Sequence, residues 1–361
     1  MSVHTLQVPS QSLHLRSPSP PAVAGRPSPQ LNGAFAAIDS RSRSSRPGRQ
    51  ISASGRTTTS STQPLTLSTV CQIRPMMSSD LPAVADLMRD EGWNVDFDNM
   101  AAVFEMQPLA QFVAQTMTGR IVGHCSSVCL DDSVGMLSYI LVRRQNQKQG
   151  LGSQLMKVAK EALGGRIMAF FSVEDAVPFY KSRNFETRRF SALVRDFSLD
   201  PRDFADIEVD EKVTVMRARD VDFDKLNEYD SAVQGMDRAE YLKKWILRPS
   251  NVAFAALDSD SGDVLGYVSL SFFSGRWDVN PLYADSDDVA MRLLKQASQE
   301  VSESIRVFAR IPADSVKGIK LFSRLRDTKH HRVLYLMSDK PLPNSSSDKI
   351  YSLSTVCYGL K

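Results

Sequence analysis

The sequence predicts an α/β protein, with the mixed sheet of an α+β fold, built as two tandem domains behind a disordered N-terminal tail. Three observations predict this: the chain has 361 residues, strand-like and helix-like segments alternate from residue 71 onward, and one short motif occurs twice. A chain of this length holds roughly two domains, and its 42% of hydrophobic residues can form their cores. We expect the tail over residues 1–70, the first domain over 71–200 and the second over 211–361.

The tail differs from the rest of the chain in composition. It contains 15 serines, 8 of the 18 prolines, seven arginines and a single acidic residue, Asp39. Such a segment cannot bury enough apolar surface to offset the entropy of ordering, so we expect it to be disordered. It also resembles an organelle transit peptide, although its prolines disfavour an amphipathic helix. The tail lacks the charged and apolar regions of a secretory signal, so we expect an intracellular, cytoplasmic protein, with organelle targeting by the tail as the alternative.

Charge, hydropathy and cysteine content exclude several classes of function. Residues 71–361 carry 37 basic and 40 acidic residues, whereas a nucleic-acid-binding domain needs a basic surface, so we expect no nucleic-acid partner. The longest apolar run, Val134–Val142, is about nine residues, and a spanning helix needs about 20, so we expect no membrane partner. Cys125 and Cys129 have only His124 nearby as a further ligand, so we expect no metal site and reduced thiols. The oligomeric state stays open.

The elements of the first domain follow from the spacing of apolar residues. Alternate apolar residues indicate strands, and a spacing of three to four indicates helices. One helix is expected to begin after the capping residues Ser79 and Asp80. Strands are expected at 71–74, 112–116, 121–130, 135–142 and 166–173, and further helices at 152–163 and 176–182. Strands that alternate with helices in this way indicate a mixed sheet.

An internal repeat predicts that the second domain is a copy of the first. The motif Gly119–Gly123 recurs as Gly262–Gly266, at an offset of 143 residues, and the same offset relates Arg74 to Arg217. An offset this long indicates duplication of a whole domain and not a short solenoid unit.

The segment around residue 150 has the features of a phosphate-binding loop. The apolar strand 139–142 runs into a polar loop, and the loop enters a helix through Gly150 and Gly152. The first amides of a helix are unpaired and carry the positive end of its dipole, and glycines let an anion approach them closely. The lysine of a Walker loop is absent, and Leu155 stands where the dinucleotide fingerprint needs a third glycine.

The remaining pattern, Gln147-x-x-Gly150-x-Gly152, resembles the coenzyme A pyrophosphate loop of the GNAT superfamily of acetyltransferases. The segment Pro178–Phe185 resembles the Phe-Tyr-x-x-x-Gly-Phe element of the same superfamily, with Asn184 in place of the glycine. The resemblance implies an N-acetyltransferase that uses acetyl-CoA as co-substrate and needs no metal. The cofactor contacts that it implies are Leu141, Val142, Gln147, Lys148, Gln149, Gly150, Leu151, Gly152 and Ser153.

The resemblance also suggests catalytic roles. It implies that Tyr180 protonates the departing thiolate and that a backbone N–H such as that of Val142 stabilises the oxyanion. A half-buried structural tyrosine is the alternative for Tyr180. The general base stays open, because the strand 135–142 offers no carboxylate, and Glu174 and Asp175 fit equally well as a helix cap.

The segment Glu91-Gly92-Trp93-Asn94 resembles the signature of YitH/HolE-type acetyltransferases, in which a GNAT domain is followed by a second, GNAT-like domain. This resemblance implies that Trp93 and Asn94 lie beside the acceptor, which we expect to be an amine on a small molecule or a peptide.

The second domain is expected to be degenerate as a catalyst. Its loop reads Ser286-Asp287-Asp288, without a glycine pair, and Phe322 stands where the first domain has Tyr180. Acidic residues at a helix start repel a diphosphate. The sequence therefore predicts one acetyl-CoA site, and the alternatives are transfer from a longer acyl-CoA or a non-catalytic CoA-binding or scaffold protein.

Overall fold

A computed structural model of the chain describes residues 71–93, 97–207, 211–273, 276–301, 304–342 and 347–354. The expectations for the tail and for Asn94 lie outside these residues. Within them, no helix has both the length and the apolar character needed to cross a bilayer.

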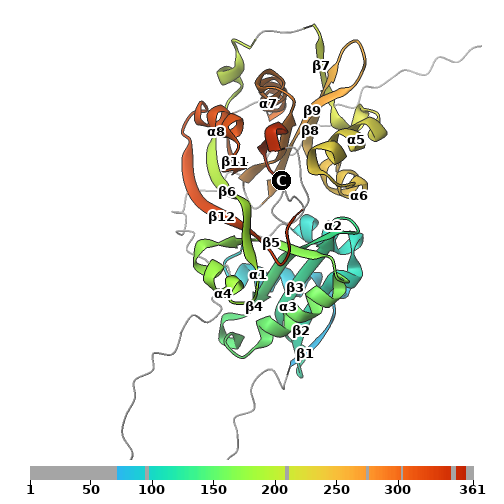
Figure 1. Ribbon diagram of the computed structural model, residues 1–361, viewed down its shortest axis with the longest axis vertical. Coiled ribbons are helices and arrows are strands. Elements are labelled where there is room, and N and C mark those ends of the chain that lie inside the picture. The colour runs from blue at the N-terminus through green and yellow to red at the C-terminus, as the bar shows by residue number, and fades with distance from the viewer. Residues whose placement is uncertain are drawn as a thin grey trace, which may run out of the picture. The chain divides into compact units, whose positions relative to one another are not determined.

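The first half of the described chain, residues 71–207, forms the mixed sheet that the sequence predicts (Figure 1). The ends of the expected strands and helices agree with the structure to within about one residue, but the sequence analysis missed helix α2 and the long strand at residues 186–199. The main elements are β1 Cys71–Pro75, α1 Leu81–Asp90, α2 Phe97–Met106, β2 Gln111–Thr116, β3 Ile121–Cys129, β4 Val134–Val142, α3 Leu151–Ala162, β5 Ile167–Val173, α4 Val177–Lys181 and β6 Glu186–Leu199.

The second half, residues 211–354, repeats this order and adds a short strand at its end. The repeat is visible in the backbone: Gly119 and Gly262 are both left-handed, with φ of 84° and 68°, and each lies between two antiparallel strands. The main elements are β7 Val213–Arg217, α5 Phe223–Gln234, α6 Ala239–Tyr241, β8 Val252–Asp258, β9 Val264–Phe273, β10 Arg276–Ala284, α7 Asp287–Val301, β11 Ile305–Pro312, α8 Val316–Ser323, β12 Lys329–Ser338 and β13 Ile350–Ser352.

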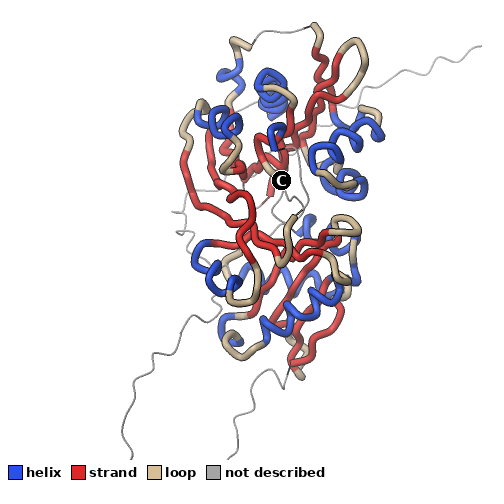
Figure 2. The backbone as a smooth tube through the Cα atoms, viewed as in Figure 1, coloured by secondary structure: helices blue, strands red, loops and turns tan. Residues whose placement is uncertain are grey.

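The two halves exchange a strand. The strand order is β1-β2-β3-β4-β5-β12-β6-β11-β10-β9-β8-β7, so β12 of the second half pairs with β5, and β6 of the first half pairs with β11. The exchanged strands β6 and β12 also pair with each other along most of their length (Figure 2). The halves therefore share one continuous sheet, and neither completes its own sheet alone.

The hydrophobic core follows this exchange. One cluster lies between α3, α4 and the sheet of the first half, and a matching cluster lies under α7 in the second half. A third cluster joins the halves on the other face of the sheet, where Met136 and Phe171 of the first half belong to one buried group with Tyr241 and Trp245 of the second. The joint between the halves is thus hydrophobic core and not a flexible linkage.

This arrangement predicts that the halves do not fold separately. Expressed alone, residues 71–207 expose the edge of β5 and leave β6 without either of its partners, so we expect aggregation and no cooperative thermal transition. Co-expression with residues 208–361 should restore a soluble complex that elutes as one species in gel filtration. A monomeric 71–207 fragment with a cooperative melt would contradict the structural role of the exchange.

Candidate active site

The candidate site is a gap in the sheet between β4 and β5. These strands pair in parallel over only three rows, from Val134 opposite Ile167 to Met136 opposite Ala169, and then diverge. Beyond these rows β4 continues to Val142, and no strand in the described part of the chain pairs with its free edge. The divergence leaves a wedge between two otherwise intact strands.

A bulge in β4 adjusts the side chains at this wedge. Ser126 of β3 lies opposite Tyr139 and the next residue, Ser127, lies opposite Leu137, so β4 holds one extra residue, Ser138. Bulges of this kind redirect side chains and are frequent beside active sites. Leu137 packs in the cluster under α3, whereas Tyr139 packs with the clusters on the opposite face.

The backbone of β4 presents hydrogen-bonding groups to the wedge. The Arg143 N–H donates to the Val122 carbonyl at 2.8 Å, and hydrogen-bonded pairs alternate with non-bonded pairs along an antiparallel ladder. Val142 and Ile140 belong to the non-bonded pairs with Gly123 and Cys125, so their amide groups point away from β3 and into the wedge. The predicted oxyanion donor, the N–H of Val142, is therefore directed into the gap.

The predicted phosphate loop lies at the end of this strand. Gly150 caps α3 in the left-handed region, with φ of 82°, and Lys148 is also left-handed at 63°. A Cβ atom on Gly150 would meet no atom within 4 Å, so the space in front of the helix is open. Exposed Lys148 and Ser153 lie on either side of Gly150, and the first amides of α3 have no acceptor within the helix.

Two of the predicted contacts have structural roles for their side chains. The Gln147 side-chain amide donates to the Val142 carbonyl at 2.8 Å and ties the loop to the strand end. Leu151 is buried in the cluster under α3, so only its backbone faces the loop. Gln149 and Gly152 are both half-buried. A Cβ atom on Gly152 would lie 3.8 Å from the Val142 side chain, so there is room on that side.

Tyr180 lies in the same hydrophobic cluster as Ile140 and Val142. Its ring packs against Phe170, with centroids 4.4 Å apart, and its hydroxyl makes no hydrogen bond to any described residue. Burial raises the pKa of Tyr180 to about 12, so the hydroxyl keeps its proton at neutral pH. Asn184 adopts the left-handed conformation expected for the glycine position, with φ of 64°.

The Glu91-Gly92-Trp93 segment connects α1 to the loop after β4. Gly92 ends α1 with a left-handed φ of 79°, and the Trp93 N–H donates to the Met88 carbonyl at 2.9 Å, as in a Schellman cap. The Glu91 carboxylate accepts from the Arg144 N–H at 3.0 Å. The motif therefore fixes the loop that leads to Gly150.

Trp93 and His124 surround Tyr139 on the face opposite α3. The ring centroids of Trp93 and Tyr139 are 6.0 Å apart, and those of His124 and Tyr139 are 6.4 Å apart. His124 is 2% exposed, its Nδ1 lies 3.1 Å from the Phe112 carbonyl, and burial lowers its pKa to about 4. From the sequence, His124 was considered only in connection with a metal site that was not expected. The alternation of side chains along β3 was the signal that would have placed it on this face.

The second half has the same gap, but it is filled. β10 and β11 pair in parallel from Trp277 to Val279 and then diverge, and β13 enters the space between them. Leu282 of β10 pairs with Ser352 of β13, and the Leu353 N–H donates to the Arg310 carbonyl of β11 at 2.7 Å.

The loop of the second half that matches the predicted phosphate loop is also closed. The Tyr351 hydroxyl donates to the Asp287 carboxylate at 2.6 Å, and the Lys349 ammonium lies 2.9 Å from the Asp285 carboxylate. Buried Phe322 occupies the position matched to Tyr180. The C-terminal segment thus occupies both the strand gap and the helix start.

Comparison with known proteins agrees with this geometry. Two family profiles match the chain, each described as Acetyltransferase (GNAT) domain, one over residues 108–187 and the other over residues 226–352. An uncharacterized protein of Caenorhabditis elegans is 23% identical over 222 residues, which cover 58% of this chain and 70% of that protein.

Several solved structures share the fold over both halves. A candidate acetyltransferase from Pyrococcus horikoshii superimposes with a TM-score of 0.65 at 16% identity, covering 80% of this chain and 95% of that one. A GCN5-related N-acetyltransferase from Sphaerobacter thermophilus gives 0.56 at 12% identity, covering 76% and 98%. A tandem GNAT protein from the clavulanic acid biosynthesis pathway gives 0.56 at 15% identity, covering 76% and 100%.

These findings define a tandem acetyltransferase fold with one wedge-shaped gap and one filled gap. The chain belongs to the GNAT acetyltransferase family and carries two GNAT domains in tandem. Its class of reaction is acyl transfer.

Buried His124 predicts a pH dependence of stability. Its folded pKa of about 4 lies below the ordinary 6.5, so the unfolded chain binds the extra proton first as the pH falls. This contribution is complete above pH 6.5 and is lost as the pH falls toward 4, by about 2 kcal/mol between pH 7 and 5. Urea unfolding of His124→Asn should show a shallower decline over this range than the unmodified protein.

The matched control is His330→Asn, which removes an exposed imidazole and should leave the decline unchanged. An equal decline in the His124→Asn protein would show that this histidine is not kept neutral by burial.

Proposed function

We propose that the chain transfers an acetyl group from acetyl-CoA to an amine acceptor by direct attack in a ternary complex. The observation that carries this proposal is the wedge between β4 and β5, where one edge of β4 pairs with no strand of the described chain and a glycine-capped helix begins at its end. Membership of the GNAT family supports acetyl-CoA as the donor.

The donor would bind along β4. Its diphosphate would lie at the N-terminus of α3, where Gly150 and Gly152 admit it and Lys148 adds positive charge. Its pantetheine arm would run along the free edge of β4, where the amide groups of Ile140 and Val142 offer the hydrogen bonds of a missing strand.

Acetyl transfer then requires attack by the amine, loss of the thiolate and two proton transfers. The amine nitrogen attacks the thioester carbonyl, the C–N bond forms and the C–S bond breaks. The Val142 N–H would stabilise the oxyanion, and Tyr180 would give its proton to the departing thiolate. The amine must also lose a proton. β4 contains no carboxylate, so the proton would go to a water or to a carboxylate of another element, such as Glu174 or Asp175 after β5.

Only the first half would bind the donor. In the second half the equivalent edge of β10 is paired with β13, and Asp285 and Asp287 stand where the diphosphate would lie. Negative charge at a helix start repels a diphosphate.

We predict one CoA per chain in titration calorimetry. Gly150→Asp should abolish binding, because it strains a left-handed position and adds negative charge at the helix start. The control Ser286→Asp changes the matching loop of the second half, keeps an acceptor for the Val289 N–H, and should leave binding intact. Two CoA molecules per chain would contradict a single site.

We predict that Tyr180→Phe slows turnover and leaves CoA affinity unchanged. The ring packing against Phe170 persists, and only the proton donor is lost. A general acid contributes about 10²- to 10⁴-fold, so turnover at saturating acetyl-CoA should fall at least about a hundredfold. Turnover above about a third of normal would assign protonation of the thiolate to water.

A further inference from the structure

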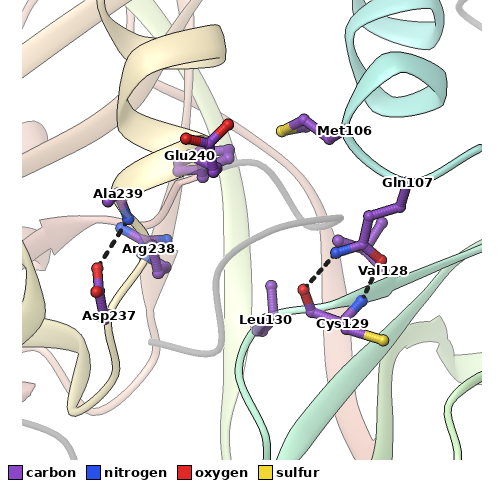
Figure 3. Close-up of a pocket in the computed structure, with 10 residues that line it drawn as sticks. Met106, Gln107, Val128, Cys129, Leu130, Asp237, Arg238, Ala239 and Glu240 are labelled. Atoms are coloured by element: carbon purple, nitrogen blue, oxygen red, sulfur yellow. Dashed lines mark hydrogen bonds between the residues drawn. The ribbon is translucent and has the colours of Figure 1, made fainter.

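A cavity of about 290 Å³ lies where the first and second halves meet (Figure 3). The first half contributes the end of α2 and the end of β3, and the second half contributes the turn that enters α6. Its volume is at the lower end of the range for small-molecule pockets, about 300 Å³.

The strand register places this cavity beside the mouth of the wedge. Val128 in its wall pairs with Met136, and Met136 is the last residue of β4 that pairs with β5. Val128 and Met136 both pack in the cluster on the face opposite α3 and Tyr180. The donor would occupy the α3 face and the gap, so an acceptor arriving from the opposite face would pass this cavity.

One wall of the cavity is apolar and firmly held. Met106, Val128 and Leu130 supply its hydrophobic surface. The side-chain amide of Gln107 donates to the Cys129 carbonyl and accepts from the Cys129 N–H, each at 2.6 Å. These two bonds fix the end of α2 to β3, so the wall is preformed for an alkyl chain.

The other wall is negatively charged. The guanidinium of Arg238 is bound to the Asp230 carboxylate at 2.6 and 2.9 Å, in a pair with almost no exposure, so this cation is already neutralised. Glu240 is exposed, and among the described residues its one ion-pair partner is the Lys244 ammonium, 3.8 Å away and four residues further along the chain.

Asp237 adds a second carboxylate to this wall. One of its oxygens accepts from the Ala239 N–H at 2.9 Å and from the Asn227 amide at 3.2 Å. With Arg238 paired to Asp230, the two carboxylates make the formal charge of the lining residues negative. Glu240 lies across the cavity from Met106, whereas the Asp237 carboxylate is turned toward the Ala239 N–H (Figure 3). A short alkyl chain that ends in an ammonium group matches both walls.

We propose that this cavity binds the remote ammonium group of a small aliphatic diamine acceptor while the other amine enters the wedge. Glu240 is the specificity-determining counter-ion, and Met106, Val128 and Leu130 contact the alkyl chain. This inference rests on the proposed acetyl transfer, because the amine that enters the wedge is the one that would be acetylated.

The test uses two probes with the same five-carbon chain, 1,5-diaminopentane and pentylamine, which differ by one ammonium group. Acetyl transfer is followed by release of the CoA thiol in the full-length protein, Glu240→Gln, and the control Glu228→Gln, which changes an exposed acid of α5 outside the cavity. The unmodified protein and the control should prefer the diamine in kcat/KM. Glu240→Gln should lose up to about fivefold for the diamine, the upper end for an exposed ion pair, and nothing for pentylamine.

A binding measurement separates this inference from the proposed function. Titration of 1,5-diaminopentane into the CoA-loaded protein should give a Kd that rises about fivefold in Glu240→Gln and stays constant in Glu228→Gln. If no amine is acetylated but this difference remains, the proposed function fails and the cavity assignment stands. If amines are acetylated and Glu240→Gln leaves both the diamine preference and the Kd unchanged, the cavity assignment is overturned.

Discussion

The pairing of β12 with β5 and β6 is the interaction on which the rest of the structure depends. β5 needs a partner on the edge away from β4, because a buried strand edge with unpaired amides costs free energy. β12 supplies that partner from the other half of the chain, and β6 supplies the same to β11. With its outer edge held, β5 can diverge from β4 beyond Ala169 without leaving the sheet.

Where the two parallel strands diverge, backbone groups of β4 and of β10 lose their strand partner, and the two halves differ in what replaces it. Past the three parallel rows, the amide groups of Ile140 and Val142 face the gap in the first half, and those of Leu282 and Ala284 face it in the second. In the second half, β13 satisfies Leu282 from within the chain. In the first half no strand of the described chain pairs with these groups, and although the Val142 carbonyl accepts from Gln147, the N–H groups of Ile140 and Val142 point into the gap toward a ligand.

The local features of the site were predictable from sequence because they depend on short-range chemistry. The glycine at 150 gives a left-handed helix cap, and Asn184 takes the same backbone conformation at the end of α4. The strand exchange and β13 were not predictable, because they pair residues such as Leu334 and Val173 that lie far apart in the chain. Composition and periodicity identify a strand, but they do not specify its neighbour.

The strand exchange has a consequence for synthesis on the ribosome. Val173 of β5 pairs with Leu334 of β12, so the outer edge of β5 has no native partner until the chain has grown by some 160 residues. At about 5–20 residues per second this interval lasts roughly 8–30 seconds. During that time the apolar strand β5, which includes Phe170 and Phe171, presents an open edge to the cell. Nascent chains of this protein therefore pass through a period in which the fold itself does not yet protect the edge of the first sheet.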